Sequence, residues 1–202
     1  MTAIVDYRAG NLTSVKNAFA ALGVETVVTR DPAAIASADR VVFPGVGAAR
    51  SAMENLRNLG LVEAVRTAAT DGRPFLGICL GMQILFNHSE EDGGVDRLGI
   101  VKGSVRRFPD GTGDKIPQIG WNDVSRTERG ECAADFSGRE FYFVHSYYAE
   151  VVPETSLVTE YAGVKFTAMV ERGPLWACQF HPEKSGRVGL DLLRAWLDIP
   201  RR

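Results

Sequence analysis

Short apolar runs alternate with stretches of helical periodicity through the first half of the chain. The apolar runs predict strands at residues 3–6, 25–29, 40–43 and 74–79. Between the runs, apolar residues recur at helical spacing and predict helices after Asn11, after Asp31, and at 48–59 and 61–70. Strands that alternate with helices predict parallel pairing through right-handed crossovers.

The second half of the chain alternates apolar and polar residues instead. This pattern predicts strands at residues 100–108, 141–149, 156–161, 164–170 and 175–180, followed by a closing amphipathic helix. A polar, acidic loop at 87–94 separates the two halves. We therefore expect one α/β domain over residues 1–202. Its central sheet should be open, mixed and largely parallel, flanked by helices, with a more antiparallel C-terminal half.

Composition and charge change this picture little. Of 202 residues, 45% are hydrophobic and 24% charged, and the formal net charge is −2. These values give no reason to expect nucleic acid or a membrane as a partner. The chain has three cysteines, no Cys-x-x-Cys or His-x-x-x-His pair and no signal-peptide layout. These features favour a reducing, cytoplasmic setting. We expect neither a disulfide framework, nor a structural metal, nor a cofactor.

Residues 77–81, Gly-Ile-Cys-Leu-Gly, join an apolar strand to a helical pattern at Met82, Leu85 and Phe86. A glycine two residues on each side of a nucleophile is the arrangement of a nucleophile elbow. Such a turn is strained and leaves no room for side chains at the glycines, and the start of a helix favours a thiolate. A small buried cysteine at a strand end would give the same pattern, so this motif alone leaves both interpretations open.

A cysteine nucleophile needs a base, and the chain has three histidines. His181 follows an apolar strand and precedes Glu183 by two residues, so Cys79, His181 and Glu183 can act as nucleophile, base and orienting acid. His145 is the rival base, although no carboxylate follows it closely. His88 is expected at the surface. A strand-end histidine bonded only to backbone is the alternative for His181.

Residues 44–47, Pro-Gly-Val-Gly, follow the third predicted strand. Their glycines allow unusual φ values and let backbone N–H groups approach a ligand, although a plain loop would look the same. No Gly-Lys-Ser/Thr follows, which excludes a phosphate loop. Cys132 and Cys178 are expected to be structural.

Residues 77–83, together with His181-Pro182-Glu183, resemble the class I glutamine amidotransferases. Further motifs narrow the resemblance to the HisH family, the glutaminase subunits of imidazole glycerol phosphate synthase: residues 6–7, 10–12, 44–48, 116–122, 143–147 and 181–185. The resemblance spans the whole chain, including its length. Gln118 departs from the family pattern, which favours histidine there.

The resemblance implies a glutaminase. Cys79 would attack the side-chain amide of L-glutamine to form a thioester, His181 would accept and return the proton, and Glu183 would hold the imidazole. The oxyanion would be bound by backbone N–H groups of Leu80 and of the turn at Val46 and Gly47. The glutamine would be held by Gln83, Glu91, His145, Ser146 and Tyr147.

The resemblance also implies a partner. The family passes ammonia to the HisF cyclase subunit, a (β/α)8 barrel, which converts PRFAR to imidazole glycerol phosphate and AICAR in histidine biosynthesis. In such a heterodimer Asn11, Trp121 and Lys184 would lie at the interface, and a solvated side chain at the start of a helix is the alternative for Lys184. Because an uncoupled glutaminase would waste glutamine, we hypothesise that residues 44–47 are set for oxyanion binding only when the partner's ligand is present.

Other interpretations explain less of the sequence. A related amidotransferase subunit serving another synthase, such as the one for pyridoxal phosphate, is disfavoured by residues 6–11 and 184–185. A non-catalytic binding module would not need Cys79, His181 and Glu183. A cysteine esterase or peptidase fits the elbow but leaves the other motifs unexplained.

Overall fold

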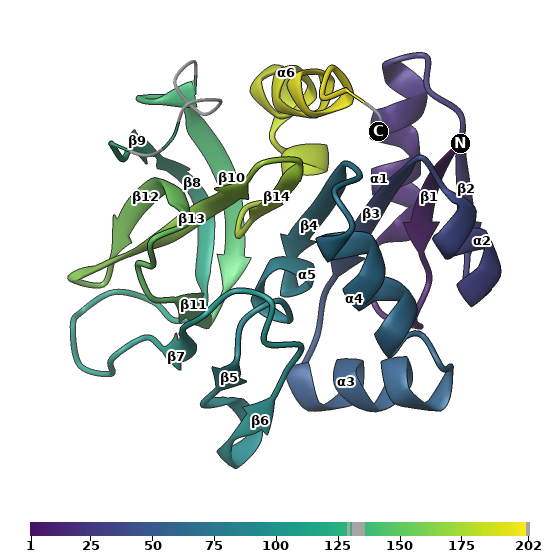
Figure 1. The fold of residues 1–202 in the computed structure, drawn as a ribbon. Helices are drawn as coiled ribbons and strands as arrows, with labels where there is room; N and C mark the ends of the chain where they lie inside the picture. Colours follow the sequence, from purple (N-terminus) through teal and green to yellow (C-terminus); the bar gives the residue numbers. More distant parts are fainter. Residues whose placement is uncertain (129, 131–135, 201–202) are drawn as a thin grey trace.

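An eight-stranded mixed sheet runs through the centre of the computed structural model, which describes residues 1–128, 130 and 136–200 (Figure 1). Parallel pairing joins one half of this sheet, in the order β2 (Thr26–Thr29), β1 (Thr2–Val5), β3 (Arg40–Gly45), β4 (Phe75–Cys79) and β14 (Leu175–Cys178). Antiparallel pairing extends it through β13 (Val164–Arg172), β12 (Thr155–Tyr161) and β9 (Ser125–Arg126). The predicted α/β class and the mixed sheet are confirmed.

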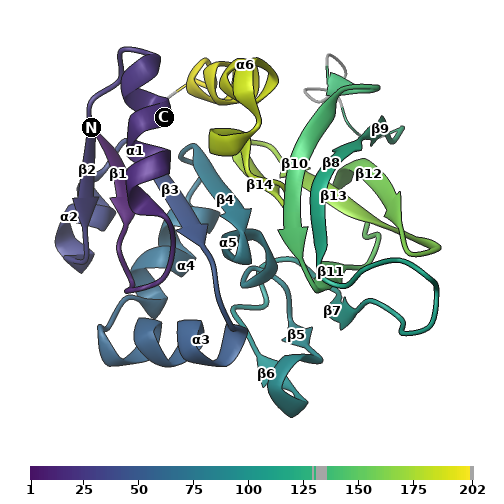
Figure 2. The same cartoon turned by 180° about the vertical axis from the view of Figure 1, so that it is seen from behind.

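Helices cover both faces of the parallel half. Helices α2 (Pro32–Ser37), α3 (Ala49–Asn58) and α4 (Val62–Thr70) pack with one set of strand side chains, including Phe43 and Phe75. On the opposite face, which Figure 2 shows from the front, α1 (Leu12–Ala21) and α6 (Gly186–Leu197) pack with the alternate side chains. Alternation along buried parallel strands thus produces two apolar layers, as expected when both faces of a sheet are covered.

Two smaller sheets lie beside the antiparallel half of the main sheet. One is the antiparallel pair of β8 (Gln118–Asp123) and β10 (Glu140–His145). The other has the order β11 (Tyr147–Ala149), β7 (Ser104–Arg107), β5 (His88–Ser89) and β6 (Val95–Asp96). Short 3₁₀ helices, η1 (Glu91–Gly93) and η3 (Pro182–Lys184), follow β5 and β14 in the chain. Of these pieces, β10, β11, η1 and η3 contribute residues to the site described below.

The structure corrects three local predictions and adds one strand that was not predicted. The strand expected at 100–108 begins only at Ser104, and the one expected at 141–149 is two strands, β10 and β11, in different sheets. Strand β8 was not predicted, because this two-stranded ribbon exposes Ile119 and Trp121 and lacks an alternating apolar face. The helix expected to reach Phe86 is α5 (Leu80–Gln83) alone, since the next carbonyls accept bonds from residues 98–101 instead.

Two predicted helix starts have the capping contacts that their residues suggest. The Asn11 side chain accepts a hydrogen bond from the N–H of Ser14 at 3.2 Å, and Asp31 accepts one from Ala33 at 3.0 Å, with Pro32 in the first helical turn. Among the described residues, no helix is long and apolar enough to cross a membrane.

Gly189 lets α6 approach the segment that carries His181 and Glu183. A Cβ at this position would overlap the backbone carbonyl of Pro182. Alanine usually stabilises a helix relative to glycine, but here Gly189→Ala should lower the free energy of unfolding by about 2 kcal/mol. Urea unfolding measures this, with Ser51→Ala at an exposed position of α3 as the control. Equal stability of the two variants would contradict this packing.

Candidate active site

Cys79 lies at the junction of β4 and α5 in a strained backbone conformation with positive φ, at φ 54° and ψ −110°. The two flanking glycines are required by space. A Cβ at Gly81 would overlap the carbonyl oxygen of Phe43, and one at Gly77 would lie 3.0 Å from the Cβ of Ala177. The predicted strained elbow is confirmed. Because α5 has only four residues, its dipole contributes little to a thiolate, and a nearby cation matters more.

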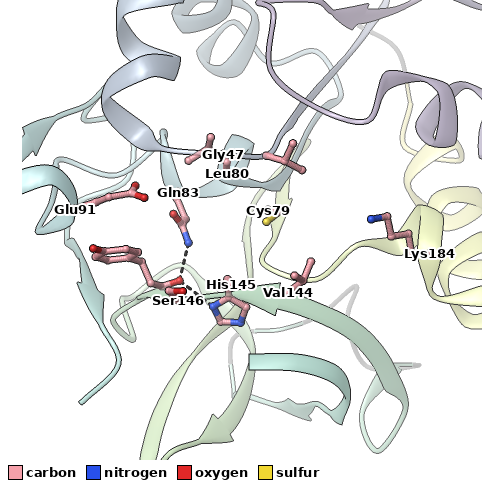
Figure 3. Close-up of a pocket in the computed structure, with 11 residues that line it drawn as sticks. Gly47, Cys79, Leu80, Gln83, Glu91, Val144, His145, Ser146 and Lys184 are labelled. Carbon is pink, nitrogen blue, oxygen red and sulfur yellow. Dashed lines mark hydrogen bonds between the residues drawn. The ribbon is translucent and has the colours of Figure 1, made fainter. Parts of the chain in front are cut away.

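The sulfur of Cys79 opens onto a cavity of about 380 Å³ (Figure 3). Its lining combines the elbow, the turn after β3, η1, the corner between β10 and β11, and the end of η3: Val46, Gly47, Cys79, Leu80, Gln83, Glu91, Val144, His145, Ser146, Tyr147 and Lys184. All the residues predicted to hold glutamine or its oxyanion therefore surround one cavity. Val144 was not predicted.

His181 and Glu183 form a buried pair behind the cysteine. The His181 Nδ1 atom lies 2.7 Å from Oε1 of Glu183, and both side chains are only 2% exposed. Nε2 of His181 is buried and makes no hydrogen bond within the described part of the chain. Burial alone would lower the pKa of His181, but the Cys79 sulfur and the Glu183 carboxylate outweigh it and raise this pKa to about 10. An imidazolium beside Cys79 is what a thiolate needs.

His145, the rival base, lies in a different environment. Its Nδ1 is 2.8 Å from the carbonyl oxygen of Tyr147, which makes Nδ1 the donor, and Nε2 is buried without a partner among the described residues. Burial, reinforced by the charge of His181, lowers the pKa of His145 to about 4. His145 is therefore neutral at pH 7, and none of the described carboxylates bonds to its ring, which favours His181 as the base.

A relay of hydrogen bonds connects the carbonyl of Tyr147 with the Cys79 sulfur through two glutamine side chains. Gln83 donates through Nε2 to the carbonyl of Tyr147 at 2.7 Å and to Oε1 of Gln179 at 2.9 Å. Gln179 is fully buried, and its own Nε2 donates to the Cys79 sulfur at 3.6 Å. Because a carbonyl can only accept, the Tyr147 bond fixes the orientation of both amides and directs N–H toward the sulfur.

Gln179 was missed by the sequence analysis. Its position two residues before His181, on the same side of an extended segment, was a usable signal. Its side-chain partners, Gln83 on α5 and Cys79 at the end of β4, are about 100 residues away in the sequence, so no local pattern reveals them.

Glu91 closes the other end of the cavity, opposite Lys184 in Figure 3. Its Oε2 accepts a hydrogen bond at 2.8 Å from the N–H of Ala49, the first residue of α3, and lies 3.7 Å from the Arg97 guanidinium. Burial raises the pKa of Glu91, while the Ala49 bond and Arg97 lower it and Asp92 raises it further. The sequence analysis missed Arg97, a charged residue in what reads as a plain loop.

The turn expected to bind an oxyanion faces the sulfur. Strand β3 pairs with β4 as far as Gly45, opposite Cys79, and the chain then turns through Val46 and Gly47. Gly47 has φ +98°, a conformation that glycine adopts without strain. Leu80, the residue after the nucleophile, lines the same side of the cavity.

The residues predicted to meet a partner lie in three places. Lys184 is at the cavity rim, with Nζ 6.0 Å from the ring centroid of Tyr142. Trp121 is on β8, beside Tyr142 of β10, and is 54% exposed. Asn11 caps α1. Cys178 is buried, with its thiol directed at backbone carbonyls, and Cys132 lies outside the described residues.

The sequence profile of the family "Glutamine amidotransferase class-I" matches residues 3–197. The chain belongs to the class-I glutamine amidotransferase family. The match contains every element that contributes to the cavity, from the turn after β3 to η3.

Curated relatives of this amidotransferase are named as HisH subunits of imidazole glycerol phosphate synthase. The one from Methanothermobacter thermautotrophicus is 45% identical over 100% of both chains. Those from Streptococcus sanguinis and Desulfovibrio desulfuricans are 45% and 48% identical, covering 96% and 100% of this chain and 93% and 96% of theirs. The predicted resemblance to the HisH family is confirmed.

Solved structures agree at the level of the fold. A crystal structure of a glutamine amidotransferase aligns with a TM-score of 0.71 at 20% identity, and PurLQS from Thermotoga maritima aligns with 0.72 at 18%. Each alignment covers 98% of this amidotransferase and 97% of the other chain.

Replacing the acid of the buried pair should show which charge keeps His181 protonated. Glu183→Gln removes a carboxylate that raises the pKa of His181, so this pKa should fall and the imidazolium should be lost at lower pH. Histidine titration by NMR measures the change in an amidotransferase with only three histidines. Asp96→Asn, which removes the carboxylate 3.0 Å from His88, is the matched control and should leave His181 unchanged. An unchanged titration in Glu183→Gln would refute the role of the pair.

Removing the amide donor should make the cysteine less reactive. Gln179→Met deletes the N–H that points at the sulfur, and one lost hydrogen bond predicts alkylation by iodoacetamide about 3- to 10-fold slower at pH 7. Gln118→Met, at another buried glutamine, is the control and should react at the parent rate. If both variants react alike, the relay does not act on Cys79.

Proposed function

We propose that this chain is the glutaminase subunit of imidazole glycerol phosphate synthase. It hydrolyses L-glutamine to glutamate and ammonia, and a HisF-type cyclase subunit uses the ammonia to convert PRFAR to imidazole glycerol phosphate and AICAR in histidine biosynthesis. The observation that carries the proposal is a strained elbow cysteine beside a buried His181–Glu183 pair in a chain about 45% identical to HisH subunits along its whole length.

The first half of the reaction transfers the glutamyl group to sulfur. The Cys79 thiolate attacks the side-chain amide carbon, and a tetrahedral oxyanion forms. The imidazolium of His181 donates its Nε2 proton to the departing nitrogen as the carbon–nitrogen bond breaks, which releases ammonia and leaves a thioester. Glu183, bonded to Nδ1, holds the ring in the orientation that directs Nε2 at the reacting atoms.

The second half of the reaction regenerates the cysteine. Neutral His181 accepts a proton from water, the resulting hydroxide attacks the thioester carbon, and the carbon–sulfur bond breaks to give glutamate and thiolate. Both tetrahedral intermediates carry a negative oxygen. Backbone N–H groups of Leu80 and of the Val46–Gly47 turn are the donors that we assign to it.

Three groups of cavity residues are assigned to the bound glutamine. Glu91, a carboxylate at the closed end, suits the α-ammonium group. The His145–Tyr147 corner offers backbone and hydroxyl groups for the rest of the substrate, and Gln83 lies between this corner and the sulfur. Glu91 and Cys79 lie apart along the cavity, so a glutamine held at Glu91 by its ammonium group would extend its side-chain amide toward the nucleophile (Figure 3).

Ammonia must reach its acceptor without entering water, where it would be protonated and lose its nucleophilicity. We assign the docking face for the cyclase subunit to the side of the molecule that carries Asn11, Trp121 and Lys184. Its exposed apolar side chains, Trp121 and Ile119 at 54% and 62%, are suited to burial by a partner. The glycines of residues 44–47 permit a peptide flip at little steric cost, so we propose that the partner's ligand sets this turn for oxyanion binding.

Glutamate release from L-glutamine tests the proposal directly. The chain should be slow alone and strongly activated by a HisF-type barrel with its nucleotide ligand, and Cys79→Ala should abolish activity in both mixtures. Activity that ignores the barrel would retain the glutaminase chemistry but reject this partner and the gated turn. Absence of activity in every mixture would reject the enzyme assignment.

A further inference from the structure

Arg97 is a buried cation that the proposed mechanism does not use. Its side chain has no exposed surface, and Nε, Nη1 and Nη2 make no hydrogen bond within the part of the chain that is described. Burying a guanidinium without acceptors is costly, so such a residue needs a compensating interaction. Arginine is also the side chain that stays charged most persistently on burial.

The interaction that compensates Arg97 is with Glu91. The closest approach, from an Nη atom to Oε2, is 3.7 Å, which is an ion pair without direct hydrogen bonding. Burial, partly offset by the Glu91 carboxylate, lowers the pKa of Arg97 to about 10, so the guanidinium is still charged at neutral pH. The Glu91 side chain is 14% exposed, and what it exposes faces the cavity in front of Cys79.

The other charges around Glu91 do not replace Arg97. The N–H of Ala49 at the start of α3 donates to Oε2, Asp92 adds a like charge, and Tyr147 is a neutral phenol across the cavity. Arg50 lies in the same region, but it donates to the carbonyls of Asp92 and Gly94. Arg97 is therefore the buried positive charge directed at this carboxylate from behind.

We propose that Arg97 is a positioning residue for glutamine binding, which keeps Glu91 ionised and aimed into the cavity to receive the substrate's α-ammonium group. The inference rests on the proposed function. In this arrangement the charges alternate: the buried guanidinium of Arg97, the carboxylate of Glu91 at the cavity wall, and then the ammonium group of the substrate. Arg97 does not contact substrate itself, because it does not line the cavity.

A purely structural role predicts something different. Arg97→Met removes one partner of this ion pair and leaves the Glu91 carboxylate uncompensated, so a purely structural role predicts a lower free energy of unfolding and nothing more. What the substitution should remove is the positive charge behind Glu91. Without it the pKa of Glu91 should rise, because burial and Asp92 then act with less opposition.

Calorimetric titration of L-glutamine into the full chain between pH 5 and 8 tests this, with Cys79→Ala in every sample to prevent turnover. Binding to ionised Glu91 is present above its pKa and is lost as the pH falls through it. Arg97→Met should move the midpoint of this loss up by about one pH unit, which makes binding about tenfold weaker on the acid side. Arg97→Lys, which keeps a charge, should largely restore the parent curve.

Three further variants separate the possible outcomes. Arg57→Met, at an exposed arginine of α3, removes the same charge elsewhere and should follow the parent curve. Glu91→Gln should bind weakly without this pH dependence. Parent-like binding by Glu91→Gln would reject the substrate site itself. Weak binding by Glu91→Gln with an unmoved midpoint in folded Arg97→Met would overturn only the role of Arg97. Arg97→Gln supplies the same test should the methionine variant fail to fold.

Discussion

The close approach of α5 to the end of β3 is the constraint on which the rest of the site depends. Gly81 has no side chain, so its backbone packs against the carbonyl of Phe43, and the chain must turn sharply at Cys79 to achieve this. The cost of the positive-φ conformation at Cys79 is offset by the surrounding packing of two apolar layers. In return the sulfur projects beyond the sheet edge, where parallel strands present their carboxyl ends.

Burial has opposite consequences for the two histidines near the cysteine. His145 has a neutral carbonyl as its partner, so burial decides its protonation and keeps it neutral. His181 has a carboxylate and a sulfur as partners, so charge decides and the ring is protonated. The same apolar surroundings therefore produce one hydrogen-bonding group and one acid–base group. Such separation of neighbouring pKa values is how sites assign acid and base roles.

The sequence revealed the elements with strong periodicity and the residues with distinctive chemistry. Strands β1 to β4, helices α1 to α4, the Cys79 elbow and the His181–Glu183 pair follow from local patterns, because each depends on residues close together in the chain. Strand β8 and the division of 141–149 at Ser146 were not predictable, since both result from pairing between distant segments. Gln179 and Arg97 were missed for the same reason: their significance lies in partners from other elements.

At Ser146 the chain passes from one of the two small sheets into the other. Before it, β10 pairs with β8, which carries the exposed Trp121; after it, β11 pairs with β7, whose sheet includes β5 next to η1 and Glu91. The corner between them forms one wall of the cavity. A displacement of the β8–β10 ribbon cannot leave that wall unmoved. Thermodynamic reciprocity then applies. Any molecule that binds the ribbon and increases the affinity for glutamine must itself bind with higher affinity when glutamine is present.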